Sequence, residues 1–213
     1  MARDRSATGD ESADTAARKA ILRERLLVAR RGLDPQARAA AGHQLRDAVL
    51  GAPETEMAGV VAAYLSVGTE PDTRGLVYAL WKRGTYVLLP LLRPGGDLDW
   101  ASYEGPDSVA PGPHGLLEPT ERPRGVAAIT SADLVIVPAL AADRRGQRLG
   151  RGGGSYDRAL ARVGPAVLTV ALLYDGELLD DIPAGPFDQP VRAAARPGEG
   201  ITRLPSPLLP FSS

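Results

Sequence analysis

The residues best suited to chemistry lie close together between Val137 and Leu160, where arginine and glycine dominate. An apolar run, Leu134 to Leu140, leads into a loop with four arginines and four closely spaced glycines. Glycine lets a backbone approach a ligand closely and turn its amides inward. Arginines beside such amides, at the start of a helix, favour an anion site of the kind that binds polyphosphate. Asp157, directly after the loop, suits a hard cation such as Mg²⁺ that neutralises the same phosphates.

This loop differs from the common nucleotide-binding motifs. A P-loop needs a Gly-Lys-Ser/Thr sequence, and no lysine lies nearby. The dinucleotide pattern needs a glycine spacing that Gly150 to Gly154 do not have. The alternative is a flexible surface loop with solvated arginines. The residue types alone leave both open and favour phosphate binding, because loops tend to carry function.

The composition argues against several other kinds of site. The chain of 213 residues has no cysteine, which excludes thiol nucleophiles, disulfides and thiolate metal sites. It has only two histidines, His43 and His114, which argues against a multi-histidine metal site. The net charge of −1 gives no electrostatic reason to expect a nucleic acid or an acidic membrane as a partner. Lysine occurs only at Lys19 and Lys82, so these two stand out more than the many arginines.

The sequence carries no sign of membrane insertion or export. No apolar run reaches the ~18–20 residues of a membrane span. The polar N-terminus lacks the apolar core of a signal peptide. We therefore expect a cytoplasmic protein that acts as a monomer, without a membrane or nucleic-acid partner.

Alternating helical and strand-like patterns predict the fold class. The predicted helices cover residues 15–32, 35–50 and 72–83, and a further one runs from 155 to 163. The predicted strands cover residues 60–66, 85–92, 98–103, 134–140 and 166–173. Continuous apolar strands that alternate with helices are typical of parallel sheets covered on both faces. We therefore expect a three-layer α/β/α sandwich with a mainly parallel, Rossmann-like sheet.

We expect one domain, at residues 15–195, between a disordered tail (1–14) and a weakly ordered tail (196–213). Residues 105–124 are rich in proline and glycine and predict a long irregular connection, of a length that is often functional. Ligands of parallel sheets bind beyond the carboxyl ends of the strands. We expect three segments to converge on one cleft there: residues 68–70, the loop around His114, and residues 148–157.

The loop resembles the signature of the 5-formyltetrahydrofolate cyclo-ligases, also called methenyltetrahydrofolate synthetases. The family pattern is approximately P-G-x-A-F-D-x-x-G-x-R-L-G-x-G-x-G-Y-Y-D. The matching residues are Pro138, Asp143, Gly146, Arg148, Leu149, Gly150, Gly152, Gly154, Tyr156 and Asp157. Weaker matches occur in the family's order at Lys19 with Arg23, Leu65-Ser66 with Glu70, Leu117 to Pro119, and Pro183 with Asp188. The resemblance covers residues 16–192.

The resemblance implies an enzyme that converts 5-formyltetrahydrofolate and ATP to 5,10-methenyltetrahydrofolate, ADP and phosphate, using Mg²⁺. In such a reaction the γ-phosphoryl group is transferred to the formyl oxygen. N10 then attacks the formyl carbon and phosphate leaves. No enzyme nucleophile is needed, which suits a chain without cysteine. Catalysis of this kind rests on positioning and charge neutralisation.

The resemblance also implies a role for each matching residue. Catalysis would involve Arg148, Tyr156 and Asp157. The folate would contact Leu65, Glu70, His114 and Tyr156, and the Glu70 carboxylate would accept hydrogen bonds from pterin N–H groups. The Mg²⁺ ion would bind Asp157 and Asp188. ATP would bind Lys19, Arg23, Arg148, Leu149, Gly150, Arg151, Gly152, Gly153, Gly154, Ser155 and Tyr156.

The weaker matches each have an ordinary structural alternative. Lys19 and Arg23 fit a solvated helix face at i,i+4 spacing. Glu70 fits a turn or helix-start carboxylate, and Asp188 fits a turn aspartate.

The sequence also departs from the family pattern in four places. The family usually has a second tyrosine, an aromatic residue, a histidine and an acidic residue where this chain has Ser155, His114, Phe187 and Arg192. The alternative function is therefore a nucleotide- or folate-binding protein that lacks this reaction or acts on another heteroaromatic substrate.

Overall fold

The computed structural model describes residues 5–205, with side chains from residue 13 on. A seven-stranded sheet has the strand order β12-β11-β9-β6-β1-β2-β3. Its strands are β1 (Val60–Ala62), β2 (Tyr86–Leu92), β3 (Leu98–Ser102), β6 (Leu134–Pro138), β9 (Leu168–Leu172), β11 (Ala193–Arg196) and β12 (Gly200–Arg203). The strands from β11 to β2 are parallel, and the edge strands β3 and β12 are antiparallel to their neighbours. The predicted, mainly parallel sheet is confirmed.

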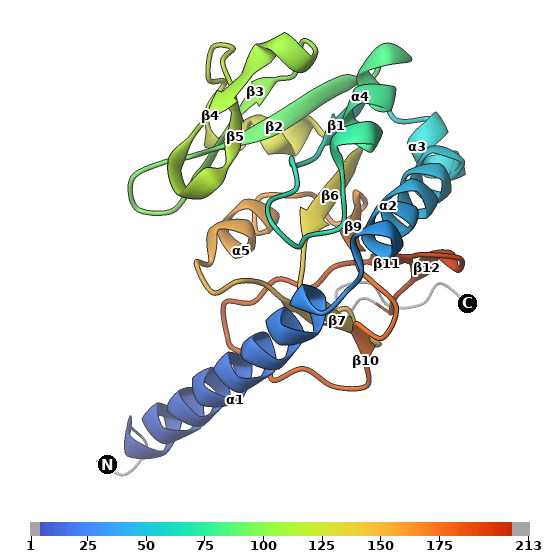
Figure 1. The fold of residues 1–213 in the computed structure, drawn as a ribbon. Helices are drawn as coiled ribbons and strands as arrows, with labels where there is room; N and C mark the ends of the chain where they lie inside the picture. Colours follow the sequence, from blue (N-terminus) through green and yellow to red (C-terminus); the bar gives the residue numbers. More distant parts are fainter. Residues whose placement is uncertain (1–4, 206–213) are drawn as a thin grey trace, which may run out of the picture.

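Helices cover both faces of this sheet (Figure 1). On one face lie α2 (Pro35–Leu50) and α4 (Arg74–Lys82), and the short α3 (Pro53–Glu56) leads from α2 to β1. On the other face lie α5 (Ser155–Leu160) and the 3₁₀ helix η3 (Val126–Ser131). Successive strand residues point to opposite faces, so Ile136 packs with α2 and α4 while Val135 packs with α5 and η3. The predicted α/β/α sandwich is therefore confirmed.

Helix α1 (Arg5–Arg31) extends away from the sheet and is anchored near its C-terminal end (Figure 1). The buried Arg30 guanidinium donates to both carboxylate oxygens of Glu177 and to the carbonyl of Ala139, each at 2.7 Å. It also lies over the ring of Tyr174, 5.3 Å from the ring centroid. This buried contact fixes the position of α1 against the ends of two central strands.

Helix α1 begins within the segment that we expected to be a disordered tail. The helix continues back to Arg5 because no proline interrupts it and each added residue contributes one further backbone hydrogen bond. Residues 1–4 of that segment lie outside the described residues. None of the helices of residues 5–205 combines the length and the hydropathy that a membrane span requires.

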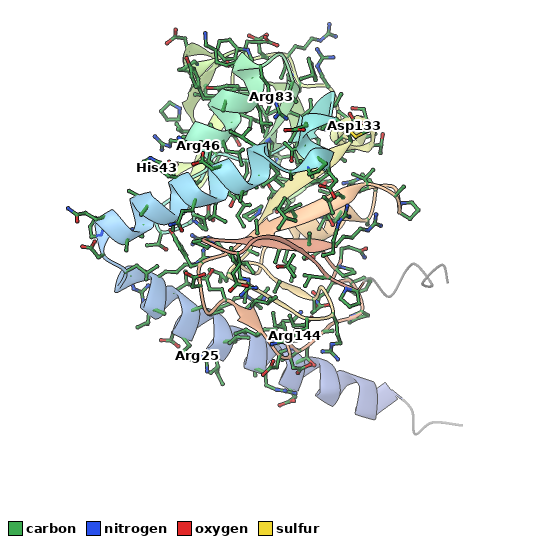
Figure 2. All side chains as sticks on the ribbon, turned by 90° about the vertical axis from the view of Figure 1, so that its right-hand side faces the viewer. Arg25, His43, Arg46, Arg83, Asp133 and Arg144 are labelled. Carbon is green, nitrogen blue, oxygen red and sulfur yellow. The ribbon has the colours of Figure 1, made fainter. Side chains whose placement is uncertain are left out.

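Helix α2 starts where the sequence predicts. The Asp34 side chain accepts hydrogen bonds from the N–H groups of Gln36 and Ala37, at 2.9 and 3.1 Å, and Pro35 occupies the first turn. Figure 2 shows Arg25 on α1 and His43 on α2 with their side chains on the outer sides of these helices. His43 is exposed, so it lies outside any enclosed site.

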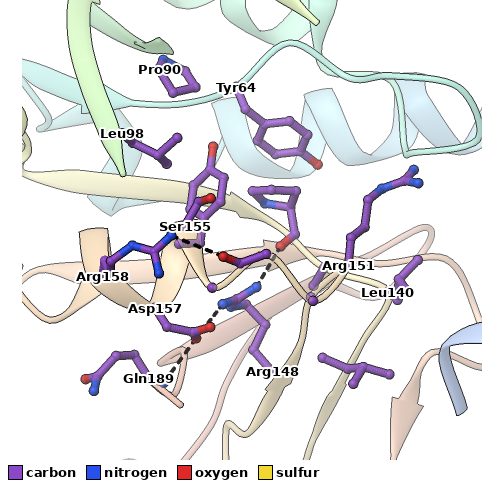
Figure 3. Close-up of a pocket in the computed structure, with 18 of the residues that line it drawn as sticks. Tyr64, Pro90, Leu98, Leu140, Arg148, Arg151, Ser155, Asp157, Arg158 and Gln189 are labelled. Atoms are coloured by element: carbon purple, nitrogen blue, oxygen red, sulfur yellow. Dashed lines mark hydrogen bonds and ion pairs between the residues drawn. The ribbon is translucent and has the colours of Figure 1, made fainter. Parts of the chain in front are cut away.

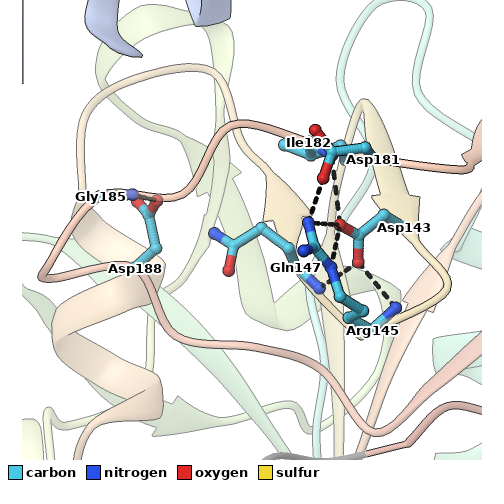
Figure 4. A network of polar contacts seen from close by, with 7 residues as sticks. All are labelled: Asp143, Arg145, Gln147, Asp181, Ile182, Gly185 and Asp188. Carbon is cyan, nitrogen blue, oxygen red and sulfur yellow. Dashed lines mark hydrogen bonds and ion pairs between the residues drawn. The ribbon is translucent and has the colours of Figure 1, made fainter. Parts of the chain in front are cut away.

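A small second sheet lies beyond the carboxyl end of β6. Its strands are β7 (Ala141–Asp143), β8 (Arg148–Leu149) and β10 (Leu178–Leu179). The fully buried Asp143 carboxylate accepts hydrogen bonds from the N–H groups of Arg145, Gln147 and Ile182, at 2.8, 2.9 and 3.1 Å (Figure 4). This network fixes the turn that leads into the glycine-rich loop.

Three further segments differ from the prediction. Residues 105–124 contain a hairpin of β4 (Val109–Pro111) and β5 (Leu117–Pro119), and the Glu118 carboxylate ties it to the N–H of Leu92 at 2.7 Å. They also contain two short 3₁₀ helices, η1 (Pro106–Ser108) and η2 (Pro113–Gly115). Strand β12 lies in the segment that we expected to be a weakly ordered tail, of which residues 206–213 lie outside the described residues. Strand β1 ends at Ala62, although the sequence predicts a strand over residues 60–66. Beyond Ala62 the chain leaves the sheet, and the Tyr64 carbonyl accepts a hydrogen bond from the Thr73 hydroxyl at 2.6 Å.

Candidate functional site

A cavity of about 1000 Å³ lies where the chain leaves the carboxyl ends of β1 and β6. The three segments that we expected to converge all line it, together with part of α1 and the connection between β10 and β11. The candidate residues on its walls are Lys19, Arg23, Leu65, Glu70, His114, Arg148, Leu149, Gly150, Arg151, Gly152, Gly153, Gly154, Ser155, Tyr156, Asp157 and Asp188. The structure therefore gathers every candidate site residue around one space.

The glycine-rich loop between β8 and α5 forms one wall of the cavity. Among the hydrogen bonds of the described residues, none has a backbone N–H of residues 150–154 as its donor. Gly154 has a φ of 68°, which places it in the left-handed region that favours glycine. A Cβ atom at Gly150 would lie 2.6 Å from the Arg148 Nη1 atom. The loop thus offers free amides, and a side chain at residue 150 would displace the neighbouring guanidinium.

An ion pair between Arg148 and Asp157 lies beneath this loop. The Arg148 Nη2 atom lies 2.7 Å from the Asp157 Oδ1 atom, and the Arg148 side chain is only 4% exposed. The same oxygen accepts a hydrogen bond from the N–H of Gln189 at 3.3 Å (Figure 3). The Arg148 Nε atom is buried and has no partner among the described residues. These contacts hold the Asp157 carboxylate in one place at the start of α5.

Helix α1 contributes two basic side chains to the same end of the cavity. The ammonium of Lys19 is paired with the Asp188 carboxylate, which also accepts a hydrogen bond from the N–H of Gly185 at 2.6 Å. The Arg23 Nε atom donates to the Gly150 carbonyl at 2.8 Å. Lys19 is buried and paired, so a solvated helix face does not describe it.

Glu70 reaches across the cavity to the glycine-rich loop. Its Oε1 atom lies 3.0 Å from the Arg151 Nε atom of the glycine-rich loop. Its Oε2 atom accepts a hydrogen bond from the N–H of Val67 at 2.9 Å, as a turn carboxylate would. One carboxylate therefore both closes its own turn and reaches the loop.

The end of the cavity around Glu70 is mainly apolar. Its walls include two tyrosine rings, Tyr64 and Tyr156, and the apolar residues Pro90, Leu92, Leu98, Leu116 and Leu117. Burial, with the nearby Glu70 charge, raises the pKa of both tyrosines above the usual value, so both stay neutral phenols at neutral pH. Such walls suit a flat heterocycle of low charge.

The four departures from the family pattern lie in different places. Ser155 and Phe187 line the cavity, as does the exposed His114. His114 has a φ of 57° and is the one non-glycine residue of positive φ among the described residues. Arg192 is absent from the walls: its guanidinium donates to the Val167 carbonyl at 2.7 Å, at the opposite end of β9.

Few acidic side chains are available for a metal ion. Residues 5–205 contain no group of three or more His, Cys, Asp or Glu side chains that could hold one. Asp157 and Asp188 are each paired with a basic side chain. Mg²⁺ is often bound by one or two carboxylates together with the phosphates of a substrate. The two aspartates fit that mode and do not fit a site made of protein ligands alone.

Sequence comparison identifies the family. A sequence model of the 5-formyltetrahydrofolate cyclo-ligase family matches residues 15–197. The chain belongs to this family. It is 37% identical to the 5-formyltetrahydrofolate cyclo-ligase of Mycolicibacterium smegmatis over 192 residues, which cover 87% of this chain and 97% of that protein. It is 33% identical to the Escherichia coli K12 enzyme of the same name over 173 residues, or 80% of this chain and 95% of that protein.

Solved structures of cyclo-ligase relatives share the fold. The 5,10-methenyltetrahydrofolate synthetase of Aquifex aeolicus superposes with a TM-score of 0.78 at 26% identity, over 92% of this chain and 95% of that chain. The enzyme of the same name from Mycoplasma pneumoniae gives a TM-score of 0.66 at 16% identity, over 83% of this chain and 96% of that chain, and supports the fold alone.

Sequence reasoning missed several residues of the cyclo-ligase cavity. Pro90 and Leu98 come from β2 and β3, and which of their side chains face the cavity depends on the pairing register. Gln189 contacts Asp157 only through its backbone N–H, a contact that no residue type signals. The apolar patterns predict strands at residues 85–92 and 98–103, which β2 and β3 confirm, but they do not predict which face of each strand lines the cavity.

Proposed function

We propose that this chain catalyses the ATP-dependent cyclisation of 5-formyltetrahydrofolate to 5,10-methenyltetrahydrofolate. The observation that carries this proposal is the single cavity, which joins a basic loop with free amides to an apolar end holding one carboxylate. Phosphates suit the first end and a pterin ring suits the second. Family membership supplies the reaction that uses both.

The proposed reaction transfers one phosphoryl group and closes one ring. The formyl oxygen attacks the γ-phosphorus of ATP, the bond to ADP breaks, and an imidate phosphate forms. N10 then attacks the formyl carbon, loses its proton, and phosphate departs with the carbon–oxygen bonding electrons. Positioning and charge neutralisation supply most of the catalysis in phosphoryl transfer, so the enzyme needs no nucleophile of its own.

At the phosphate end, ATP would lie along residues 148–156, with Lys19 and Arg23 closing the site from α1. The loop amides would donate to phosphate oxygens, and the guanidinium of Arg148 would neutralise charge from below the loop. Tyr156, a neutral phenol, would lie between the phosphates and the folate.

At the folate end, Leu65 and His114 would contact the substrate from the side away from the loop. Glu70 would accept hydrogen bonds from pterin N–H groups through the carboxylate that now binds Arg151. The apolar walls would exclude water from the reacting atoms, which strengthens the electrostatic contacts there.

A magnesium ion would be held by Asp157 and Asp188 together with the phosphates of ATP. When bound, it supplies positive charge that neutralises the phosphates. Asp157 and Asp188 would orient the metal-bound nucleotide, and Arg148 and Lys19 hold these two carboxylates in position.

We further propose that the protein acts as a cytoplasmic monomer. The support for a monomer is that all candidate side chains come from one chain, so a second copy is not needed to complete the cavity. The support for the cytoplasm is that the proposed reaction consumes ATP, which cells hold in that compartment.

The experiment that tests the function is formation of the methenyl chromophore from 5-formyltetrahydrofolate by purified protein. Saturating ATP and magnesium should give product, and omission of ATP should abolish it. The Asp157→Asn variant provides a folded control. If the wild-type protein gives no more product than a reaction without enzyme, the alternative of a binding protein without this activity replaces the proposal.

A further inference from the structure

One exposed aromatic residue on the cavity wall has no role in the reaction described above. Phe187 is 84% exposed and lies in the connection between β10 and β11. Single exposed hydrophobic side chains are ordinary on protein surfaces. The other exposed large hydrophobic residues with described side chains, however, all lie off the cavity: Ile21, Val28, Met57 and Tyr78.

The segment that carries Phe187 is fixed on both sides of the ring. The next residue, Asp188, is paired with Lys19 of α1 and accepts the N–H of Gly185 at 2.6 Å. The N–H of Gln189 donates to the Asp157 carboxylate at 3.3 Å. An aromatic ring on so well anchored a backbone loses little freedom when a ligand binds to it.

Both anchors of this segment belong to the phosphate end of the cavity. Lys19 and Asp157 flank the glycine-rich loop, and Figure 3 shows Gln189 beside Asp157 and Arg148. Tyr64, Pro90 and Leu98 lie on the other side of the same view. Phe187 therefore lies on the part of the cavity wall that is anchored to Lys19 and Asp157, next to the glycine-rich loop.

We propose that Phe187 is a stacking platform for the adenine ring of ATP. This inference rests on the proposed function and deepens it, because it assigns the base of the nucleotide to a part of the cavity. A phenyl ring carries no charge and binds phosphate poorly, but its face stacks on any flat heteroaromatic ring. Adenine is the flat ring that a nucleotide places near its phosphates.

The test compares two ligands that share the phosphates and differ in the base. Isothermal titration would measure ATP and inorganic tripolyphosphate against the wild-type chain and the Phe187→Ala, Phe187→Trp and Met57→Ala variants. Phe187→Ala should weaken ATP about tenfold, or about 1.4 kcal/mol, and change tripolyphosphate less than about twofold. Phe187→Trp should restore ATP affinity. Met57→Ala, which removes an equally exposed side chain away from the cavity, should change neither.

Three results would overturn the inference. Unchanged ATP affinity in Phe187→Ala would show that the ring contacts no base. Equal loss of affinity for ATP and tripolyphosphate would mean that the ring contacts no base and only helps to position the segment that contains Asp188. In the methenyl-formation assay, a raised folate KM of the Phe187→Ala variant with unchanged ATP affinity would place the ring at the folate instead. Failure of the proposed function is separate, since it would appear as missing methenyl product in the wild-type chain whatever the titrations give.

Discussion

The Nε atom of Arg151 lies 3.0 Å from the Oε1 atom of Glu70, so the glycine-rich loop and the β1–α4 connection are joined across the cavity. The arginine is half exposed and the carboxylate is nearly buried. Phosphates bound at the loop would compete with Glu70 for this guanidinium. The carboxylate would then become available to a second ligand, which links the occupancy of the two ends of the cavity.

Replacing Glu70 with glutamine should impair folate binding selectively. The amide keeps the size of the side chain but loses an acceptor for pterin N–H groups, at a cost of about 1–3 kcal/mol. The folate KM should rise about tenfold, whereas the ATP KM should not rise, because the substitution also weakens the competition of residue 70 with phosphate for Arg151. Steady-state kinetics with each substrate varied would measure this. Glu54→Gln removes a surface pair with Arg203 and is the matched control. Equal effects on both substrates would contradict the assignment.

Replacing Arg151 with alanine should remove the coupling between the two substrates. In the wild-type chain, a non-hydrolysable ATP analogue should tighten folate binding about fivefold, which is within the usual range of coupling energies. In the variant the ratio of folate Kd values with and without the analogue should fall to about one. The fold should be stable, since an exposed ion pair contributes about 0–1 kcal/mol. A ratio that stays at its wild-type value would mean that coupling takes another route.

Replacing Arg148 with alanine should weaken ATP more than folate. A hydrogen bond from a charged donor to phosphate is worth about 1.5–3 kcal/mol, which predicts a loss of ATP affinity of about 10–100-fold. The change also leaves the Asp157 carboxylate without its partner, so thermal unfolding should be measured in parallel. A folded variant with wild-type ATP affinity would show that Arg148 serves only to hold Asp157.

Replacing Asp157 with asparagine should nearly abolish turnover and leave the fold intact. The amide preserves the shape of the side chain but removes the charge that would hold magnesium. Turnover measured across a magnesium titration would check this, with circular dichroism as the control for folding. Wild-type activity of the variant at limiting magnesium would mean that Asp157 serves only as the ion-pair partner of Arg148.

Stability should fall in acid partly through Asp97. Hydrogen bonding from Arg162, at 2.7 Å, lowers the pKa of Asp97 below its ordinary value of 3.8. A carboxylate whose pKa is lower in the folded protein than in the unfolded chain stabilises the fold fully at pH values above its unfolded pKa. That stabilisation is lost as the pH falls through the pKa of the folded protein. Because the pair is partly exposed, we expect about 0.5 kcal/mol at pH 7.

Urea unfolding of Asp97→Asn should show that difference from wild type at pH 7, and the difference should shrink steadily as the pH falls below the ordinary value of 3.8. Asp180→Asn removes another arginine-paired carboxylate, one that is almost fully exposed, and is the control. A difference that persisted at low pH would mean that the substitution acts through packing.

The glycine-rich wall of the cavity was predictable as one unit because its residues are contiguous in sequence. Residues 148–157 carry their own turn chemistry, so their types already predict a close approach to an anion. The pairing of Lys19 with Asp188 was not visible in the same way, because 169 positions separate the two residues. Only the docking of α1 brings them together.

Other parts of the fold depend on tertiary pairing rather than on local pattern. Ala193–Arg196 and Gly200–Arg203 have few residues that favour strands, and they form β11 and β12 because β9 offers an edge to pair with. The apolar wall of Pro90 and Leu98 follows from the antiparallel register of β2 and β3. The alternation of apolar runs predicts these two strands but not that register.

The anchoring of α1 has a consequence for the order in which the protein is made. Ribosomes synthesise α1 first, yet Arg30 binds Glu177, 147 positions later, and Lys19 binds Asp188 later still. Contacts of such long range form slowly and late, after the segments between them have folded. A nascent chain therefore carries the first basic residues of the site long before the rest. The cavity is complete only once synthesis has passed Asp188, so a chain that is cut short has no finished site to occupy.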